Sequence, residues 1–525
     1  MSDMASRRRP NLLLIMFDQL APQSLPSYGH PLVQAPHFDR LAAEGVQFEN
    51  AYCNSPLCAP ARFSMMAGQL PSRIGAWDNA AEFPVSIPTF AHYLRSAGYR
   101  TCLSGKMHFV GPDQLHGFEE RVTTDIYPGD FGWTPEWDHP EKLQWWFHNM
   151  LCVTEAGPYD RSLEMDYDEE VAFHAARWIQ DAERDDDERP WLLTVSFIHP
   201  HDPYLAPRDC WACYDRARID MPAVPFIPVG KRDPLSRRMF ELYDRGEYRV
   251  TAEHVRTARH AYYAMITYAD ALMGRVLSAL KATGAAEDTV VIATADHGDM
   301  LGERGLWYKM TFFERSVRVP MILHTPKRFR PRRVKQNVSL LDVLPTLAEL
   351  GDVKQDPVVP VDGRSLLPLA AGDGRDWPDA VCAEYMAEGT TEPVFMIRRG
   401  RHKYIACAGD PPQLFDLESD PHELDNLAEK AEFRKLSASF AEEVARKWDG
   451  AALRRSIIDS QRQRVFVQQA LLTGRRVHPW DFEPRQDVAQ RYYRNYGAEM
   501  YDTDRRARLP LRPEPPKDGP GRQGA

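Results

Sequence analysis

The sequence has no apolar run long enough for a signal peptide or a membrane-spanning helix at its start. The first run, residues 12–17, follows three arginines but ends after six apolar residues at Asp18. A secretory signal needs about 7–15 apolar residues and a small-residue cleavage site, and a transmembrane helix needs about 20. We therefore predict a buried strand here, a cytoplasmic protein and no membrane partner.

Cysteines and basic runs are also too few for a disulfide-rich or nucleic-acid-binding protein. Eight cysteines in 525 residues do not form a disulfide framework, and we interpret the close pair Cys210 and Cys213 as structural. The net charge is −10, and no long basic run follows the first ten residues. The sequence therefore gives no electrostatic support for a nucleic-acid partner.

Apolar residues make up 43% of the chain, enough to bury a large core. Short apolar runs predict buried strands at residues 11–18, 100–105, 191–199, 288–296 and 319–325. Apolar residues at three- and four-residue spacing predict helices at 87–97, 166–182 and 252–282. The alternation indicates an α/β fold, with a large mostly parallel or mixed sheet flanked by helices.

The pattern changes after about residue 326. A helix at 340–350, a strand at 380–384, a hairpin at 394–406 and a helix at 431–447 predict a smaller α+β unit with an antiparallel sheet. We predict an N-terminal domain at 1–375 and a smaller C-terminal α+β domain at 376–504. The tail at 505–525, rich in proline, arginine and glycine, is predicted to be extended or disordered.

Four of the predicted strands end in polar residues that carry chemistry. The strand ends lead into Asp18-Gln19, Lys106-Met-His108, His199-Pro-His201-Asp202 and Asp296-His297-Gly-Asp299. In an open parallel sheet the carboxyl ends of the strands share one edge, where ligands bind. Aspartate and histidine supply oxygen and imidazole ligands for a divalent cation, while lysine and histidine serve charge stabilisation and proton transfer.

A fifth segment, Cys58-Ala-Pro-Ala-Arg62 with Gly68 six residues later, resembles the C-x-P-x-R motif of the sulfatases. A Gly-Lys-x-His element at 105–108 and Asp-His-Gly at 296–298 strengthen that resemblance. The residues after Pro60 match a first helical turn, whose free N–H groups attract an oxyanion, and Arg62 adds a fork-shaped donor. The resemblance implies the alkaline-phosphatase-like fold and the oxidation of Cys58 to formylglycine by a formylglycine-generating enzyme.

The family resemblance also implies the metal site and the catalytic groups. One divalent cation, calcium or manganese, is expected on Asp18, Asp296, His297 and the modified Cys58; Gln19 stands where most sulfatases have a second aspartate. One hydroxyl of the hydrated aldehyde attacks sulfur and the other expels sulfate. His108 is the candidate base and His201 the candidate acid. The candidate groups for charge on the sulfuryl oxygens are Arg62, Lys106 and Lys309.

Further segments resemble choline sulfatases, among them 54–62, 71–75, 78–84, 480–484 and 491–495. A quaternary ammonium cannot donate hydrogen bonds and is bound by aromatic faces and a carboxylate. Glu499 and Asp502 are the candidate acids where those proteins have a His-Met-Asp-rich stretch, which this chain lacks. The predicted substrate-binding residues are Gln19, Asn79, Trp133, Asn149, Glu388 and Glu499.

Three alternatives stay open at this point. The same site suits phosphonate monoesters, phosphate diesters or another alkyl sulfate, since a cradle for sulfate also fits phosphate esters. A non-catalytic anion- or choline-binding protein with an unconverted cysteine is the alternative from another class. We further predict a homo-oligomer, a dimer or tetramer, in which the C-terminal segment contacts a neighbouring subunit.

Overall fold

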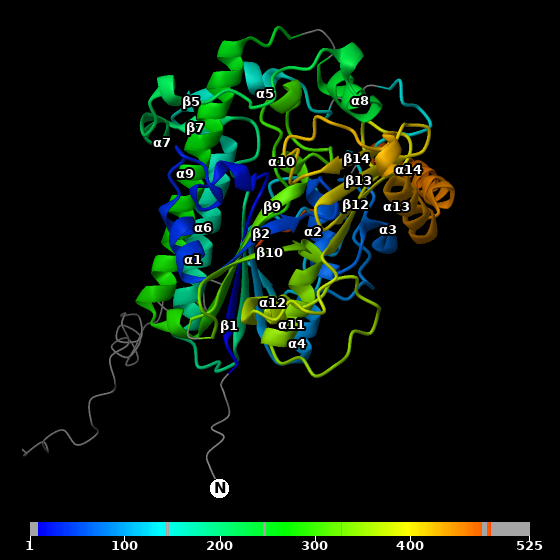
Figure 1. The fold of residues 1–525 in the computed structure, drawn as a ribbon. Coiled ribbons are helices and arrows are strands. Elements are labelled where there is room, and N and C mark those ends of the chain that lie inside the picture. Colours follow the sequence, from blue (N-terminus) through cyan, green and yellow to red (C-terminus); the bar gives the residue numbers. More distant parts are fainter. Residues whose placement is uncertain are drawn as a thin grey trace, which may run out of the picture.

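The computed structural model describes residues 9–142, 144, 146–244, 248–326, 328–474 and 480–484. Its centre is an eight-stranded sheet in the order β10-β2-β9-β8-β1-β6-β3-β4, drawn in Figure 1. All neighbours pair in parallel except β9, which is antiparallel to β2 and β8. The strands are β1 (Asn11–Phe17), β2 (Val46–Tyr52), β3 (Arg100–Gly105), β4 (Glu120–Arg121), β6 (Trp191–Phe197), β8 (Thr289–Ala295), β9 (Arg318–His324) and β10 (Arg332–Ser339).

Helices cover both faces of this sheet (Figure 1). On one face lie α1 (Pro36–Glu44), α6 (Leu163–Ala182) and α9 (Ala252–Ala282). On the other lie α2 (Cys58–Ala67), α4 (Phe90–Ser96), α11 (Val343–Leu350) and α12 (Leu367–Ala371). Since β1, β6 and β8 are covered on both sides, nearly all of their residues are buried, which explains their continuous apolar runs.

A second sheet of four antiparallel strands lies beside the large one (Figure 1). Its strands are β11 (Ala380–Tyr385), β12 (Val394–Arg399), β13 (His402–Cys407) and β14 (Gln413–Asp416), and α3 (Pro71–Ile74), α13 (Arg434–Lys447) and α14 (Gly450–Thr473) lie next to them. The remaining short elements are β5 (Gly157–Tyr159), β7 (Leu205–Pro207), α5 (Leu151–Thr154), α7 (Arg208–Ala212), α8 (Pro234–Tyr243) and α10 (Glu314–Val317).

The predicted fold class is confirmed, and the predicted strands and helices lie within a few residues of the observed ones. Strands β2 and β10 were not predicted, because charged and amide residues interrupt their apolar pattern. Strand β10 is an edge strand that exposes Arg332, Arg333 and Lys335, as edge strands often do. No helix in the described ranges is long and apolar enough to cross a membrane.

Gly105 ends β3 and turns the chain toward the edge of the sheet where the polar residues gather. Its φ is 109°, a region that favours glycine. A Cβ at this position would lie 2.0 Å from the carbonyl oxygen of Ser196 on β6. The glycine therefore allows the close approach of β3 and β6 that directs Lys106 and His108 toward the same edge.

We predict that Gly105→Ala destabilises the protein by about 2–5 kcal/mol, because it adds backbone strain to a steric clash. Urea unfolding followed by circular dichroism measures the change. Gly29→Ala is the matched control, since Gly29 has a similar φ of 101° but nothing within 4 Å of the added carbon. Equal losses in the two variants would contradict the steric argument.

Candidate active site

Four side chains of metal-ligand type meet at the carboxyl edge of the sheet. Asp18 follows β1, and Asp296 and His297 follow β8, the neighbouring parallel strand. Cys58 is the first residue of α2, a helix on one face of the sheet (Figure 1). One ligand atom from each of the four residues lies within 4.8 Å of the others, and all four residues are buried. The structure thus brings together the four residues predicted to hold the cation.

Cys58 is the first residue of α2, where the helix leaves its backbone N–H groups free. The side chain of Asn79 accepts a hydrogen bond from the Ala59 N–H at 3.0 Å, so it occupies one of these donors. The Cys58 Sγ lies 3.3 Å from Nε2 of His297 and 3.7 Å from Oδ1 of Asp18. Burial, and then Asp18, raise the pKa of the Cys58 thiol to about 11, which makes the unmodified residue a poor nucleophile at neutral pH.

Arg62, one helical turn after Cys58, joins the two carboxylates. Its Nε donates to Asp296 at 2.9 Å and its Nη2 to Asp18 at 3.1 Å, and these side chains are inaccessible to solvent. Its Nη1 donates to the hydroxyl of Ser196 at 2.8 Å. Every arm of the guanidinium is therefore held, which fixes its orientation.

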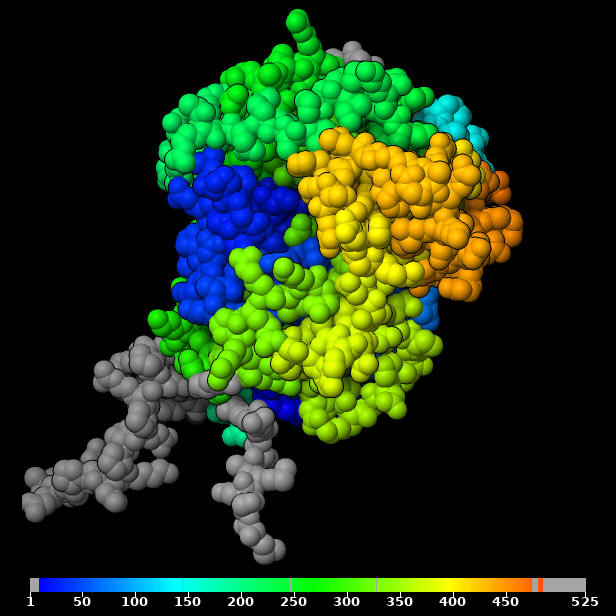
Figure 2. All heavy atoms as spheres, in the orientation of Figure 1, coloured from blue at the N-terminus to red at the C-terminus, as the bar shows by residue number. Residues whose placement is uncertain are grey.

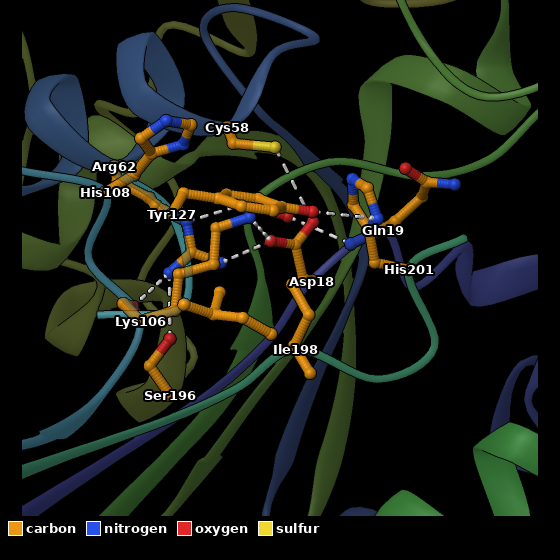
Figure 3. A network of polar contacts seen from close by, with 12 residues as sticks. Asp18, Gln19, Cys58, Arg62, Lys106, His108, Tyr127, Ser196, Ile198 and His201 are labelled. Atoms are coloured by element: carbon orange, nitrogen blue, oxygen red, sulfur yellow. Dashed lines mark hydrogen bonds and ion pairs between the residues drawn. The ribbon is translucent and has the colours of Figure 1, made fainter. Parts of the chain in front are cut away.

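Asp18 lies at the centre of the polar network in Figure 3 and also forms an ion pair with Lys106. Burial opposes its ionisation, but Lys106 and then Arg62 hold the pKa of Asp18 well below its usual range. The Lys106 ammonium lies 4.2 Å from the centre of the Tyr127 ring, a cation–π contact on its other side. The carboxylate is thus ionised and available to a metal at neutral pH.

Lys309 lies between Gln19 and His201 and contacts both side chains. Its Nζ lies 2.6 Å from Nε2 of His201 and donates to Oε1 of Gln19 at 2.7 Å. The other ring nitrogen of His201 lies 2.5 Å from the backbone oxygen of Asp202, so it must carry the proton there. Burial, and then Lys309, hold the pKa of His201 well below its usual range. The pair therefore shares the lysine proton, with the imidazole neutral.

The side-chain amide nitrogen of Gln19 is held by two carboxylate acceptors. Its Nε2 donates to Asp299 at 2.7 Å and to Asp202 at 3.2 Å, so its oxygen faces Lys309 rather than the four-residue cluster. Burial raises the pKa of Asp299 to about 6. An aspartate at position 19 would face these two acids without a donor, which accounts for an amide here.

His108 has the environment of a free base. Neither ring nitrogen has a hydrogen-bond partner in the described part of the chain, and the ring is buried. Burial, and then the charge of Lys106, lower the pKa of His108 to about 3, so the ring is neutral at neutral pH. Asp125 accepts a hydrogen bond from its backbone N–H at 2.9 Å, which holds the residue in place despite its φ of 60°.

The predicted substrate residues are more dispersed. Trp133 packs edge-on against Tyr127 and His108, with ring centres 5.0 and 5.6 Å apart. Glu388 is 4% exposed, and its Oε2 has no partner among the described residues. The Asn149 side chain accepts the Leu151 N–H at 2.9 Å, which caps a local turn. Glu499 lies outside the described residues.

Several residues of the site were not singled out from the sequence. Tyr127 and Asp125 lie in an irregular segment with no periodic signal, and Ser196 lies inside a strand. Asp202 and Asp299 stood within the polar strand ends but had been given no role. The tendency of polar residues to cluster after strands was the signal that could have identified these last two.

Helix α14 is tied to the site by a buried ion pair. Arg464 donates to both carboxylate oxygens of Asp78, at 2.7 and 2.8 Å, and both side chains are almost inaccessible. Asp78 precedes Asn79, the residue that caps α2. Helix α14 therefore stabilises the segment at 78–79, which in turn accepts a hydrogen bond from the first turn of α2.

Family models cover nearly the whole chain. The model described as Sulfatase matches residues 10–353. The model described as N-sulphoglucosamine sulphohydrolase, C-terminal, matches residues 302–449, and the one described as Choline sulfatase enzyme C terminal matches residues 455–509.

Relatives agree with these matches. A choline-sulfatase of Rhizobium meliloti (strain 1021) is 48% identical over 496 residues, covering 93% of this chain and 96% of that protein. Arylsulfatase K of Danio rerio is 30% identical over 444 residues, 81% of each chain. Among solved structures, the phosphonate monoester hydrolase of Agrobacterium radiobacter is 25% identical with a TM-score of 0.68, covering 86% of this chain and 96% of that one.

We predict that Arg464→Met lowers the free energy of unfolding by about 3–5 kcal/mol, because it leaves the buried Asp78 carboxylate unpaired. Chemical denaturation measures the loss. Arg462→Met is the control on the same helix, since Arg462 pairs with Asp138 at the surface and is 65% exposed; we expect a change of less than about 1 kcal/mol there. A loss in Arg464→Met no larger than the control's would disprove a structural role for the buried pair.

Proposed function

Because this chain belongs to the sulfatase family and is a sulfatase, we propose that it hydrolyses choline-O-sulfate to choline and sulfate. The nucleophile is formylglycine, made from Cys58. The observation that carries the proposal is the meeting of Asp18, Cys58, Asp296 and His297 in one buried cluster beside three cationic side chains. The choline part rests on the pocket chemistry and on the relative of that name.

The cluster suits a divalent cation. Two aspartates and one histidine offer oxygen and nitrogen donors, and their ligand atoms lie within 4.8 Å of one another in a buried place. Asp18, Asp296, His297 and residue 58 would hold calcium or manganese, which would draw electrons from the sulfuryl group. The amide of Gln19 is taken by Lys309, Asp202 and Asp299, so it supplies no charge to this ion.

Residue 58 is placed for attack on an anionic centre. It begins α2, whose positive end favours an oxyanion, and Arg62 and Lys106 lie beside the same carboxylate. As formylglycine, this residue would supply a hydrated aldehyde with two hydroxyls on one carbon. Arg62, Lys106 and Lys309 balance the charge of the sulfuryl oxygens, and water is excluded by the burial of all three.

His108 and the Lys309–His201 pair carry out the two proton transfers. His108 has unpartnered ring nitrogens and is neutral, so it can take the proton of the hydroxyl whose oxygen expels sulfate. On the other side, the Lys309–His201 pair holds a proton at a 2.6 Å contact. This shared proton is the one transferred to the departing alcohol oxygen, which leaves the pair with one proton fewer. The assignment keeps His201 as the acid, with Lys309 as the source of its proton.

The substrate pocket has parts for a quaternary ammonium. Trp133 and Tyr127 form an aromatic corner next to His108, and Trp146 stacks at 6.5 Å from Trp133. Glu388 keeps one carboxylate oxygen without a partner in the described chain and lies within electrostatic reach of Lys309. An aromatic wall and a buried carboxylate suit a methylated cation that offers no hydrogen bonds.

The remaining expectations belong to the same proposal. Residues 1–375 form the catalytic domain and 376–504 the C-terminal α+β domain. The chain forms a homo-oligomer in which the C-terminal segment contacts a neighbouring subunit, and Glu499 is the candidate acid for the substrate cation. The tail at 505–525 and Glu499 lie outside the described residues. A formylglycine-generating enzyme is the partner during maturation.

The direct test is choline release from choline-O-sulfate by purified full-length protein. We expect turnover by the wild type and a loss of at least about a thousandfold in Cys58→Ser, because the aldehyde precursor is gone. Mass spectrometry of the peptide that contains residue 58 must accompany the assay. A peptide that carries only thiol, in a protein without turnover, would favour the binding-protein alternative.

Aryl phosphonate monoesters and bis-aryl phosphates are the competing substrates. The structural relative that hydrolyses phosphonate monoesters makes this comparison necessary. We expect kcat/KM to favour choline-O-sulfate, and equal values for the three esters would sink the choline assignment.

We also predict a pH effect on substrate affinity. Burial raises the pKa of Glu388 to about 7, so this carboxyl group is neutral below that pH and charged above it. KM for choline-O-sulfate should therefore fall as pH rises through about 7. Glu388→Gln should raise KM by about tenfold and flatten this dependence. Glu349→Gln, at an exposed position on α11, is the control; an unchanged pH profile in Glu388→Gln would refute the role.

A further inference from the structure

A cavity of about 330 Å³, outside the four-residue cluster, lies between the eight-stranded sheet and the four-stranded sheet. Figure 2 shows a hollow where the dark blue N-terminal part, the green band above it and the gold C-terminal sheet meet. The charged residues lining the cavity are Arg304, Arg315, Arg318, Arg398, Glu303, Glu314 and Glu423. These residues come from α10, β9, β12, the 3₁₀ turn Glu303–Gly305 and the loop after β14, so the cavity is built from distant parts of the chain.

The four arginines have no carboxylate partner within 4 Å in the described part of the chain. Arg304 donates to the backbone oxygens of His422 and Glu423, and Arg318 to that of Glu49. Arg398 donates to the side chain of Asn337. Their hydrogen bonds thus go to neutral acceptors, and none neutralises the guanidinium charge.

Arg315 continues the same pattern. It donates to the backbone oxygen of Asp299 at 3.3 Å and to the hydroxyl of Ser24 at 3.1 Å. Two of the four arginines are deeply buried, with Arg304 9% and Arg398 6% exposed. Water can therefore solvate their charges only in part.

The three glutamates each have hydrogen-bond or ion-pair partners other than these arginines. Lys403 lies 2.9 Å from Glu314 and 2.5 Å from Glu423, and binds both. Glu303 accepts the backbone N–H groups of Ala223 and Val224, at 3.0 and 2.7 Å. Four arginines and one lysine thus stand against three glutamates. The lining is therefore left with an excess of positive charge.

From this arrangement we infer that the cavity is a second anion site, distinct from the catalytic centre, for a tetrahedral dianion of the sulfate or phosphate class. Guanidinium groups suit such oxyanions because each presents a planar fork of donors. The volume is at the small end for organic ligands, which fits an inorganic dianion or a small phosphate ester.

An anion bound in the cavity would affect the catalytic centre through a series of hydrogen bonds. Met300 and Arg315 line the cavity, and Arg315 holds the backbone of Asp299. Asp299 in turn accepts from Gln19, the partner of Lys309. Gln23, also in the lining, is four residues from Gln19 and has a buried Oε1 without a partner in the described residues.

Crystals of the full-length protein soaked in selenate provide the test. We expect an anomalous peak in contact with Arg304 and Arg398, separate from any peak near Cys58. The Arg304→Gln protein should lose the cavity peak and keep any catalytic one. A wild-type soak with no peak between these arginines would overturn the inference even if the variant fails to fold.

Calorimetry in solution identifies the source of the anion. Titrations with inorganic sulfate, inorganic phosphate and glycerol 3-phosphate should show that at least one of them binds the wild type, and that Arg304→Gln or Arg398→Gln weakens it at least about tenfold. Arg375→Gln, whose guanidinium is 86% exposed on the surface, should leave the affinity unchanged. Unchanged affinity for all three anions in both cavity variants would also overturn the inference.

Discussion

Two carboxylates buried side by side are the constraint on which the rest of the site depends. Asp18 and Asp296 follow neighbouring parallel strands, so the sheet itself forces them together in a region without solvent. Two adjacent negative charges in such a place must be neutralised by cations. Arg62 bridges both, and Lys106 pairs with Asp18, which is why the motif containing Cys58 is anchored here rather than elsewhere on the sheet.

The layout of the large sheet could be predicted because parallel strands covered on both faces are continuously apolar. Helix α9 was located over its full length by its spacing of apolar residues. Strands β2 and β10 escaped this reasoning, because tertiary pairing, not an apolar run, makes them strands. Helix α14 was missed for a similar reason: it buries only a few side chains, including Ile457 and Arg464, so it lacks a clear apolar face.

The residues near the metal-type cluster were predictable because they stand directly after strands or within a short motif. The residues that position these groups or pair with them could not be predicted. Tyr127, Asp125 and Arg464 act across long sequence separations, with no local pattern to mark them. Asn149 was assigned to the pocket by similarity alone, and in the structure its side chain accepts the backbone N–H of Leu151, two residues along the chain.

The burial of helix α2 has a consequence for timing in the life of the protein. All ten residues from Cys58 to Ala67 are enclosed, and Cys58 itself is 1% exposed. An enzyme that must bind this segment to oxidise the thiol has no access to it once the protein has folded. We therefore expect conversion to occur on the nascent or still unfolded chain, so that synthesis in a cell without the oxidising enzyme would yield a well-folded but permanently idle protein.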